Sequence, residues 1–276
     1  MNRFIQQILV FLHLKKTRPR RIAFATFATT DRGLVRADNQ DHFLCASDRM
    51  LFCVADGMGG GADGSLASEW ACQAIDAAVK AEENDLASRE QAIAAALTEV
   101  NTRIRAYAKE HGYKTMGTTA VGLVSEPVSG VLARIFHVGD SRAYRYRYGR
   151  LDALTRDHTV GNELGQAMAG SINGADQARV LQARSNPLTH ILTRAVGTEL
   201  RVRPEWKSID VQRGDRFLFC SDGVHDMLDD AEIAQILSQA STPRVAVARL
   251  EAAVRKAGAQ DNYTILCAYA TSRQGV

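Results

Sequence analysis

The sequence predicts an α+β fold in which antiparallel sheets are flanked by helices. Short segments rich in Val, Ile, Phe, Tyr and Thr follow one another through short turns, which is typical of antiparallel strands. Segments with apolar residues at helical spacing occur in pairs between these blocks of strands. Repeated βαβ units would instead place a helix after each strand. The 276 residues, 46% of them hydrophobic, are enough to bury one large core, so we expect one domain.

The predicted strands are runs of β-branched and aromatic residues bounded by turn residues. In chain order they are Ile22–Thr30, Phe43–Ala46, Leu51–Ala55, Thr118–Ser125, Val131–Val138, Arg142–Tyr148, Phe217–Cys220 and Tyr263–Tyr269.

Two helices are predicted back to back in the first half of the chain. Apolar residues recur at helical spacing over Leu66–Val79 and again over Ile93–Tyr107. The second run follows the motif Ser88-x-x-Gln91, which is typical of a capping box and predicts Ser88 as the N-cap.

A third helix is predicted near the C-terminus, with Thr242 as its N-cap, Pro243 at its first position and Gly258 at its end. Before it, residues 156–196 contain short helical pieces punctuated by glycines. Such a segment is a candidate for a mobile flap.

Residues 1–21 form a basic, partly apolar segment that we expect to lie outside the core of a domain spanning residues 22–272. The segment carries six Lys and Arg residues and no acid, so subtracting six charges from the net charge of +3 leaves −3 for the remainder. Its apolar stretch, Phe4–Leu14, is shorter than the roughly 20 residues that a membrane span needs. The segment is therefore either a floppy tail or an amphipathic element that docks to a membrane surface or a partner.

Composition argues against two other classes of protein. A net charge of +3 is too small to indicate a nucleic-acid binder. The five cysteines lie within apolar runs without the C-x-x-C spacing of structural zinc or of a redox pair, and are typical of buried thiols in a reduced cytosol. We expect a cytoplasmic protein, associated with a membrane only through residues 1–21.

Three aspartates, Asp56, Asp222 and Asp261, mark the ends of predicted strands. If these strands are antiparallel neighbours, their carboxylates converge at one edge, where they would repel one another unless cations neutralise them. Hard carboxylate oxygens suit Mg²⁺ or Mn²⁺. A single Asp-Gly pair is usually only a turn, but three aspartates at matching positions weaken that alternative.

A glycine run, Gly57–Gly61, follows Asp56 and would let backbone carbonyls approach an ion or a phosphate. The spacing Gly57-x-Gly59-x-x-Ala62 also fits a dinucleotide-binding fingerprint. Two features argue against that alternative. Asp56 would place a negative charge beside the pyrophosphate, and the following helix leads to another helix instead of a parallel strand.

Six short motifs resemble, in order and spacing, those of the protein phosphatase 2C family, in the form found in its bacterial branch. The resemblance covers residues 22–270. The motifs are Arg36-Ala-Asp-Asn-Gln-Asp41, Val54-Ala-Asp-Gly-Met-Gly-Gly60, Gly117-Thr-Thr119, Val138-Gly-Asp-Ser-Arg142, Cys220-Ser-Asp-Gly223 and Gln260-Asp-Asn262.

The resemblance implies a four-layer α-β-β-α sandwich, with two central antiparallel sheets flanked by helices and a site for two Mn²⁺ or Mg²⁺ ions at one end. It implies that Asp56 bridges both ions, that the carbonyl of Gly57 binds one of them, and that Asp222 and Asp261 hold the other.

The same resemblance assigns three further residues around these ligands. Arg36 matches the arginine that binds phosphate, Asp41 a residue that orders water at the metals, and Asp140 a residue used for a third, weaker ion.

The function implied is metal-dependent hydrolysis of phosphoserine and phosphothreonine in proteins through a water activated by two metals, opposing a serine/threonine kinase in bacterial signalling. Phosphorylated proteins and a cognate kinase are the expected partners, with no nucleic acid. Met58 stands where eukaryotic relatives have a histidine, and Gln40 stands where many members have an acidic residue. The alternative is a catalytically weak, phosphoprotein-binding regulatory module with the same fold. The intact aspartates and Arg36 favour the enzyme.

Overall fold

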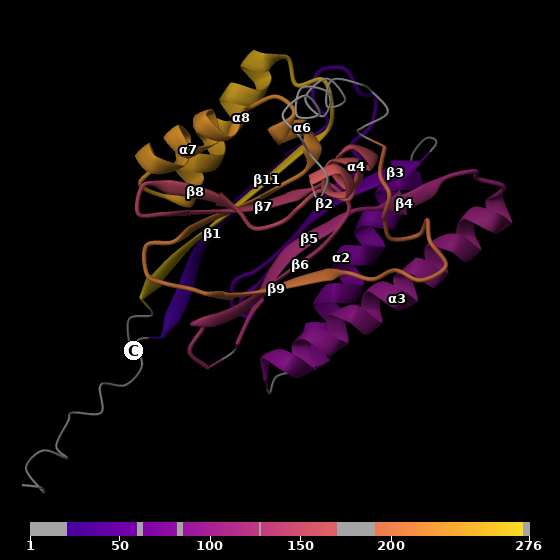
Figure 1. Cartoon of the computed structure of the whole chain (residues 1–276), viewed down its shortest axis with the longest axis horizontal. Helices are drawn as coiled ribbons and strands as arrows, with labels where there is room; N and C mark the ends of the chain where they lie inside the picture. Colours follow the sequence, from indigo (N-terminus) through magenta and orange to yellow (C-terminus); the bar gives the residue numbers. More distant parts are fainter. Residues whose placement is uncertain (1–20, 60–62, 82–84, 127, 170–190, 273–276) are drawn as a thin grey trace, which may run out of the picture.

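The computed structural model describes residues 21–59, 63–81, 85–126, 128–169 and 191–272. These residues form the expected α+β sandwich of four layers, with two antiparallel sheets in the middle and helices on the two outer faces (Figure 1). The segment predicted to lie outside the core, residues 1–21, falls outside the described residues except for Arg21.

The first sheet has the strand order β1-β11-β10-β7-β8, and all its pairs are antiparallel. Its strands are β1 (Ile22–Asp31), β7 (Arg142–Arg147), β8 (Arg150–Ala153), β10 (Arg216–Cys220) and β11 (Tyr263–Ser272).

The second sheet has the order β2-β3-β5-β6-β9, and β4 pairs with the C-terminal part of β3. Its strands are β2 (Asp41–Ala46), β3 (Leu51–Gly59), β4 (Met116–Thr118), β5 (Ala120–Ser125), β6 (Leu132–Val138) and β9 (Glu205–Asp210).

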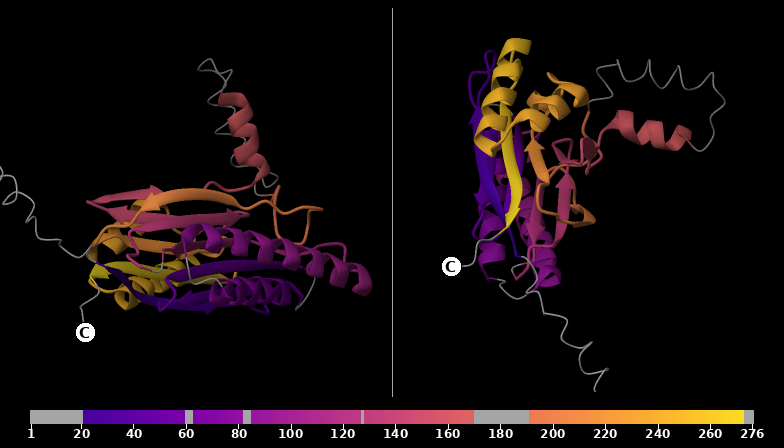
Figure 2. Two further views of the ribbon diagram at one scale, coloured as in Figure 1. Left: turned by 90° about the horizontal axis from the view of Figure 1, so that it is seen from below. Right: turned by 90° about the vertical axis from the view of Figure 1, so that its left-hand side faces the viewer.

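The helices cover the two sheets separately. Helices α2 (Asp63–Ala81) and α3 (Leu86–His111) pack on the second sheet, whereas α6 (Asp222–His225), α7 (Asp230–Gln239) and α8 (Pro243–Ala257) pack on the first. Helix α4 (Val160–Ala169) projects away from the sandwich (Figure 2). No helix among the described residues combines the length and the apolar character that crossing a membrane requires.

Alternation along the strands produces three apolar layers. In β10, Phe217 and Phe219 face the layer between the sheets, whereas Leu218 and Cys220 face the layer under α7 and α8. In β3, Phe52 and Val54 likewise face the other sheet. Both sheets are therefore buried on both faces over much of their length, which explains why their strands read as continuous apolar runs.

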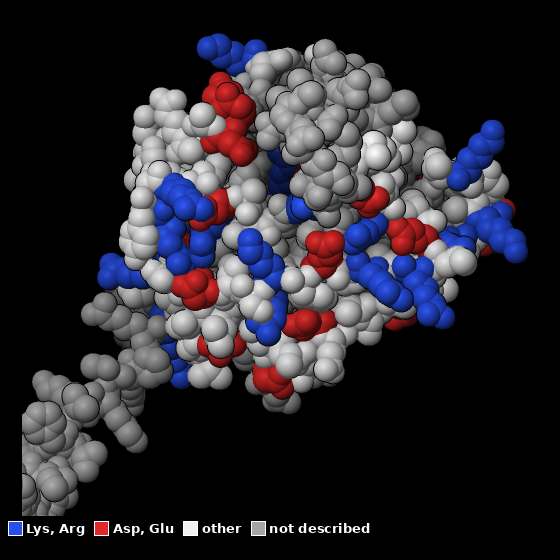
Figure 3. Space-filling view, viewed as in Figure 1, with Lys and Arg blue, Asp and Glu red and all other residues white. Residues whose placement is uncertain are grey.

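Charged side chains join β7 of the first sheet to β9, an edge strand of the second sheet. Arg147 on β7 donates a hydrogen bond to the carboxylate of Asp210 on β9 (2.9 Å) and forms an ion pair with the buried Asp215 (2.5 Å). Basic and acidic side chains are mixed over the face seen in Figure 3.

Several predicted boundaries are wrong. β3 does not end at Ala55 but runs through Asp56 to Gly59, and the predicted strand Thr118–Ser125 is interrupted at Thr119. Helix α3 begins at Leu86, because the side chain of Asp85, not Ser88, is the N-cap and accepts a hydrogen bond from the backbone N–H of Ser88 (2.9 Å). The helix from Pro243 to Ala257, with Thr242 as N-cap and Gly258 as C-cap, is confirmed.

Candidate functional site

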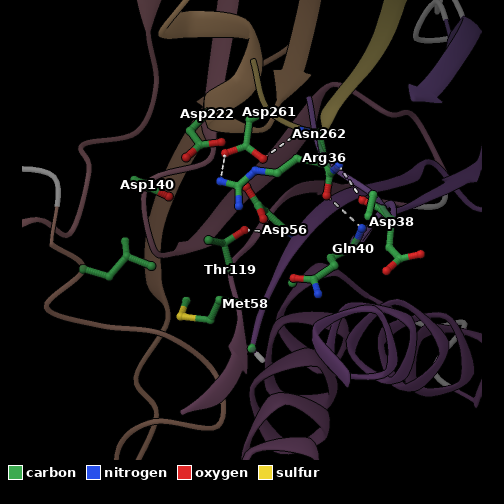
Figure 4. Close-up of a pocket in the computed structure, with 14 residues that line it drawn as sticks. Arg36, Asp38, Gln40, Asp56, Met58, Thr119, Asp140, Asp222, Asp261 and Asn262 are labelled. Carbon is green, nitrogen blue, oxygen red and sulfur yellow. Dashed lines mark hydrogen bonds and ion pairs between the residues drawn. The ribbon is translucent and has the colours of Figure 1, made fainter. Parts of the chain in front are cut away.

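A polar pocket opens at one end of the sandwich, where both sheets contribute residues (Figure 4). Among the described residues, its lining contains five aspartates and a single basic residue. The lining residues are Arg36, Ala37, Asp38, Gln40, Asp56, Gly57, Met58, Gly59, Thr119, Asp140, Leu192, Asp222, Asp261 and Asn262.

The three aspartates predicted to converge do so, but not along the edge of one sheet. Asp222 follows β10 and Asp261 precedes β11, and these two strands are antiparallel neighbours in the first sheet. Asp56 lies inside β3 of the second sheet, where it pairs across the strands with Asp41. The prediction of a common sheet edge is therefore wrong for Asp56, because the two sheets meet face to face and their strands reach the same end of the sandwich.

Hydrogen bonds to its backbone hold Asp56 in place. Its N–H donates to Thr119 Oγ1 (2.9 Å), and its carbonyl accepts from the N–H of Thr119 (2.8 Å) and from Thr118 Oγ1 (2.9 Å). The hydroxyl of Thr119 is in turn 2.7 Å from that of Ser141, next to Asp140. The two adjacent threonines thus fix the strand and leave the carboxylate of Asp56 facing the pocket (Figure 4).

Asp41 lies behind the pocket and is almost completely buried. Its Oδ2 accepts hydrogen bonds from Ser221 Oγ (2.7 Å) and Thr264 Oγ1 (2.8 Å), whereas its buried Oδ1 receives none from the described residues. Burial raises the pKa of Asp41 to about 7. A buried acceptor without a donor costs free energy, so this oxygen fits a water or a cation beside it.

Burial and mutual repulsion also act on the pocket aspartates. Burial, followed by the charges of Asp41 and Asp222, raises the pKa of Asp56 well above its usual value. Burial raises the pKa of Asp140 to about 7, with Asp222 adding to it, and burial raises the pKa of Asp222. Closely spaced buried carboxylates are the donors that a divalent cation stabilises, so these residues fit Mg²⁺ or Mn²⁺.

Arg36 reaches the pocket from the loop between β1 and β2. Its Nη2 lies 2.6 Å from Asp261 Oδ2, and 58% of its side chain is exposed. An ion pair this exposed is screened by water and contributes little to stability, so the guanidinium remains free to exchange its carboxylate for another anion.

Asn262 anchors that loop. Its side-chain amide donates to the carbonyls of Arg32 (2.9 Å) and Asp38 (2.8 Å), and its Oδ1 accepts from the N–H of Gln40 (2.9 Å). The asparagine that follows Asp261 thus fixes both ends of the segment that carries Arg36.

Gly57 lies where β3 meets the start of α2. A Cβ at this position would lie 2.0 Å from the carbonyl oxygen of Gly64 and 2.6 Å from that of Gln40, so only glycine fits. Because β3 leads through two helices to antiparallel strands, the described part of the chain has no parallel βαβ unit of the kind that binds a dinucleotide. Gly60 and Gly61 lie outside the described residues.

A second group of possible metal ligands, His137, His158 and Glu205, has donor atoms within 4.8 Å of one another. Arg194 already donates to Glu205 Oε1 (2.8 Å), and His158 Nδ1 accepts from the N–H of Gly139 (3.1 Å). Since a guanidinium already neutralises the carboxylate, these side chains brace the turn before Asp140 and offer a poor cation site.

The two ends of the predicted flap are joined at a neck next to the pocket. The N–H of Val160 donates to the carbonyl of Ile191 (3.0 Å), and that of Thr193 donates to the carbonyl of His158 (2.9 Å). Leu192, between them, lines the pocket. Within the predicted flap, residues 170–190 lie outside the described residues.

The sequence motifs contain two residues whose role was not predicted. Thr119 ends the motif Gly117-Thr-Thr119 and Asn262 ends Gln260-Asp-Asn262, and each anchors a neighbour of the pocket. Their presence in these motifs was the available signal. Asp38 had the same signal, because it lies in the motif Arg36-Ala-Asp-Asn-Gln-Asp41, whereas Leu192 had none.

This chain is similar to known proteins over most of its length. Residues 30–257 match the model of a family described as protein phosphatase 2C. The serine/threonine phosphatase stp of Listeria innocua is 34% identical over 247 residues, which cover 86% of this chain and 92% of the relative.

Solved structures match over a similar extent. PppA, a key regulatory component of T6SS in Pseudomonas aeruginosa, has 32% identity and a TM-score of 0.78, and the match covers 91% of this chain and 100% of that one. The catalytic domain of the serine/threonine phosphatase PstP, in complex with two manganese ions, has 30% identity and a TM-score of 0.74 with the same coverage.

Proposed function

Because the chain belongs to the protein phosphatase 2C family and is a serine/threonine phosphatase, we propose that it removes phosphate from phosphoserine and phosphothreonine by means of two divalent cations held in the aspartate pocket. The observation that carries the proposal is the convergence of Asp56, Asp222 and Asp261 around one pocket, in which Arg36 is the only basic residue among the described lining residues.

The proposed ligands of the two ions are Asp56, which would bridge them, the carbonyl of Gly57, Asp222 and Asp261. The manganese ions in the PstP structure and the hard carboxylate oxygens of this pocket support Mn²⁺ or Mg²⁺. When bound, such ions activate water and offset the charge that develops on the phosphoryl group. Asp140, which lines the same pocket, is the proposed ligand of a third, weaker ion.

The remaining residues position the reacting groups. The guanidinium of Arg36 can hold two phosphate oxygens side by side, which orients the phosphorus for in-line attack. The free Oδ1 of Asp41 can accept a hydrogen bond from a water behind Asp56 and so orient it. Met58 offers no proton, so the proton for the departing alkoxide must come from elsewhere than position 58.

The proposed cellular role is to oppose a serine/threonine kinase by dephosphorylating its protein targets in the cytoplasm, with residues 1–21 as a docking element. The alternative of a catalytically weak binding module is not favoured, because Asp56, Asp222, Asp261 and Arg36 all line one pocket.

Metal removal tests the proposal. Purified protein treated with a chelator should lose hydrolysis of p-nitrophenyl phosphate and of a phosphothreonine peptide, and added Mn²⁺ or Mg²⁺ should restore it, because the carboxylates alone repel a phosphate dianion. Release of inorganic phosphate is the measurement. Full turnover by protein shown to be free of metal would contradict the two-ion mechanism.

A further inference from the structure

Two large aliphatic side chains stand exposed directly before Arg36. Leu34 is 61% exposed and Val35 is 70% exposed, although both belong to the loop that enters the pocket. Single exposed aliphatic residues are common on protein surfaces, but two in succession beside a binding residue indicate contact with a ligand.

The backbone of this loop is fixed. The N–H of Leu34 donates to the carbonyl of Ala259 (2.8 Å). Gly33 adopts a positive φ of 75°, and a Cβ there would lie 2.2 Å from the carbonyl oxygen of Asp261. Together with the clamp of Asn262 on Arg32 and Asp38, these contacts fix the backbone of Leu34 and Val35 directly before Arg36, which lines the pocket. A rigid apolar pair needs little ordering when it binds, which favours affinity.

Further apolar residues border the pocket. Met58 and Leu192 belong to its lining, and Ile191 next to Leu192 is 51% exposed. The pocket thus combines an acidic floor with aliphatic side chains at its border. An acidic residue beside the phosphorylated one would be repelled by the aspartates, whereas an aliphatic residue would find apolar surface.

We propose that Leu34 and Val35 form a docking surface for an aliphatic side chain that lies close in sequence to the phosphorylated residue of a protein substrate. The inference rests on the proposed function, because it places the phosphate at Arg36. An extended peptide advances about 3.3 to 3.6 Å per residue, so a residue within about three positions of the phosphothreonine can reach the side chains next to Arg36.

The experiment compares two phosphothreonine peptides within each enzyme. One peptide carries Leu at the three positions on either side of the phosphothreonine, and the other carries Ser there. The parent enzyme with Mn²⁺ should favour the Leu peptide by about tenfold in kcat/KM, a modest value for burial of methylene groups on an open surface. In the double variant Leu34→Ser, Val35→Ser this ratio should fall to about twofold or less.

Val128→Ser is the matched control. Val128 is 62% exposed but lies in the connection from β5 to β6, at the opposite end of the sandwich from the pocket. This variant should keep the ratio of the parent.

Both peptides are compared within the same enzyme. The ratio of their kcat/KM values therefore tests the docking surface even if the double variant is less active overall. Equal rates for the two peptides in the parent, or an unchanged ratio in the double variant, would overturn the docking surface. Failure of the parent to release phosphate from either peptide would instead contradict the proposed function, so the two failures are distinguishable.

Discussion

Arg36 and Asp56 face the same pocket with opposite charges, so their removal should have different effects. Arg36→Ala removes a phosphate contact but no proposed metal ligand, and it frees Asp261 from its ion pair. Metal affinity measured by calorimetry should stay close to that of the parent. kcat/KM should fall by about one to three orders of magnitude, at roughly 1.4 kcal/mol per decade.

Asp56→Asn removes the charge proposed to bridge both ions. It should weaken metal binding in the same calorimetric assay and abolish turnover, with at most partial recovery at high Mn²⁺, because a neutral amide offsets less cationic charge. Loss of the metals in Arg36→Ala, or normal metal binding and turnover in Asp56→Asn, would show that the roles are assigned to the wrong residues.

His158 makes stability depend on pH. Burial, then repulsion by His137 and Arg194, lowers its pKa to about 4, while Glu205 opposes the shift. Between the unfolded pKa near 6.5 and pH 4 the unfolded chain binds more protons, so stability is complete above pH 6.5 and falls as the pH decreases. Through this histidine, the free energy of unfolding should decrease by at most about 2 kcal/mol between pH 7.5 and pH 5.

The test is urea unfolding of the parent and of His158→Gln at both pH values, with a chelator present. The variant should be less stable than the parent at pH 7.5, because it lacks the ring nitrogen that accepts from the N–H of Gly139. It should lose less stability than the parent on acidification. An equal loss of stability in both proteins would mean that the pKa of His158 is not lowered in the folded protein.

The sequence predicted those features of the site that follow from residue type. It was less informative on features that depend on which residues contact each other in the fold. Carboxylates at strand ends indicated a cation site from sequence alone. The roles of Thr119 and Asn262 depend on partners far away in the chain, as in the hydrogen bond from Asn262 to Arg32, which are 230 residues apart. No local pattern carries that information.

At the scale of elements, the strands buried on both faces and the edge strands β1 and β2 were predicted, whereas the edge strands β8 and β9 were missed. β9 has exposed residues at four of its positions, and β8 is short and half exposed, so neither shows an apolar run. Helix α7 was also missed, although Asp229 and Glu232 form a reciprocal capping box at its start. Edge strands are defined by a neighbour on only one side, which the sequence does not display.

The start of α3 offers a test of the corrected cap. Asp85→Ala should lower the free energy of unfolding, because it removes the side-chain acceptor for the N–H of Ser88. Ser88→Ala should cost less, since it removes only an exposed hydroxyl that contacts Asp85 (2.8 Å). Chemical denaturation of both variants is the measurement, and a larger loss in Ser88→Ala would restore Ser88 as the N-cap.

At the scale of the whole molecule, the described fold begins at the junction with the basic segment. The N–H of Ile22, at the start of β1, donates to the carbonyl of Ser129 (2.7 Å), at the end of the sandwich opposite the pocket. Deleting residues 1–20 should therefore leave kcat on p-nitrophenyl phosphate close to that of the parent. Binding to anionic vesicles, measured by sedimentation, should weaken, because the deletion removes five of the six basic residues in residues 1–21.

Insoluble expression of the truncated protein would mean that the segment packs against the domain. A shortened protein that folds, turns over substrate and sediments with vesicles as the parent does would contradict the docking role.

The neck formed by Val160 with Ile191 and by His158 with Thr193 brings together the two ends of the chain segment between these residues. Because both ends of that stretch are tied at one place, the entropy of closing it depends only weakly on its length, and doubling the length costs about 0.6 kcal/mol. The stretch can accordingly lengthen, shorten or be exchanged during evolution while the aspartates stay where they are. The length of this segment and the geometry of the aspartate pocket can in this way diverge independently within one fold.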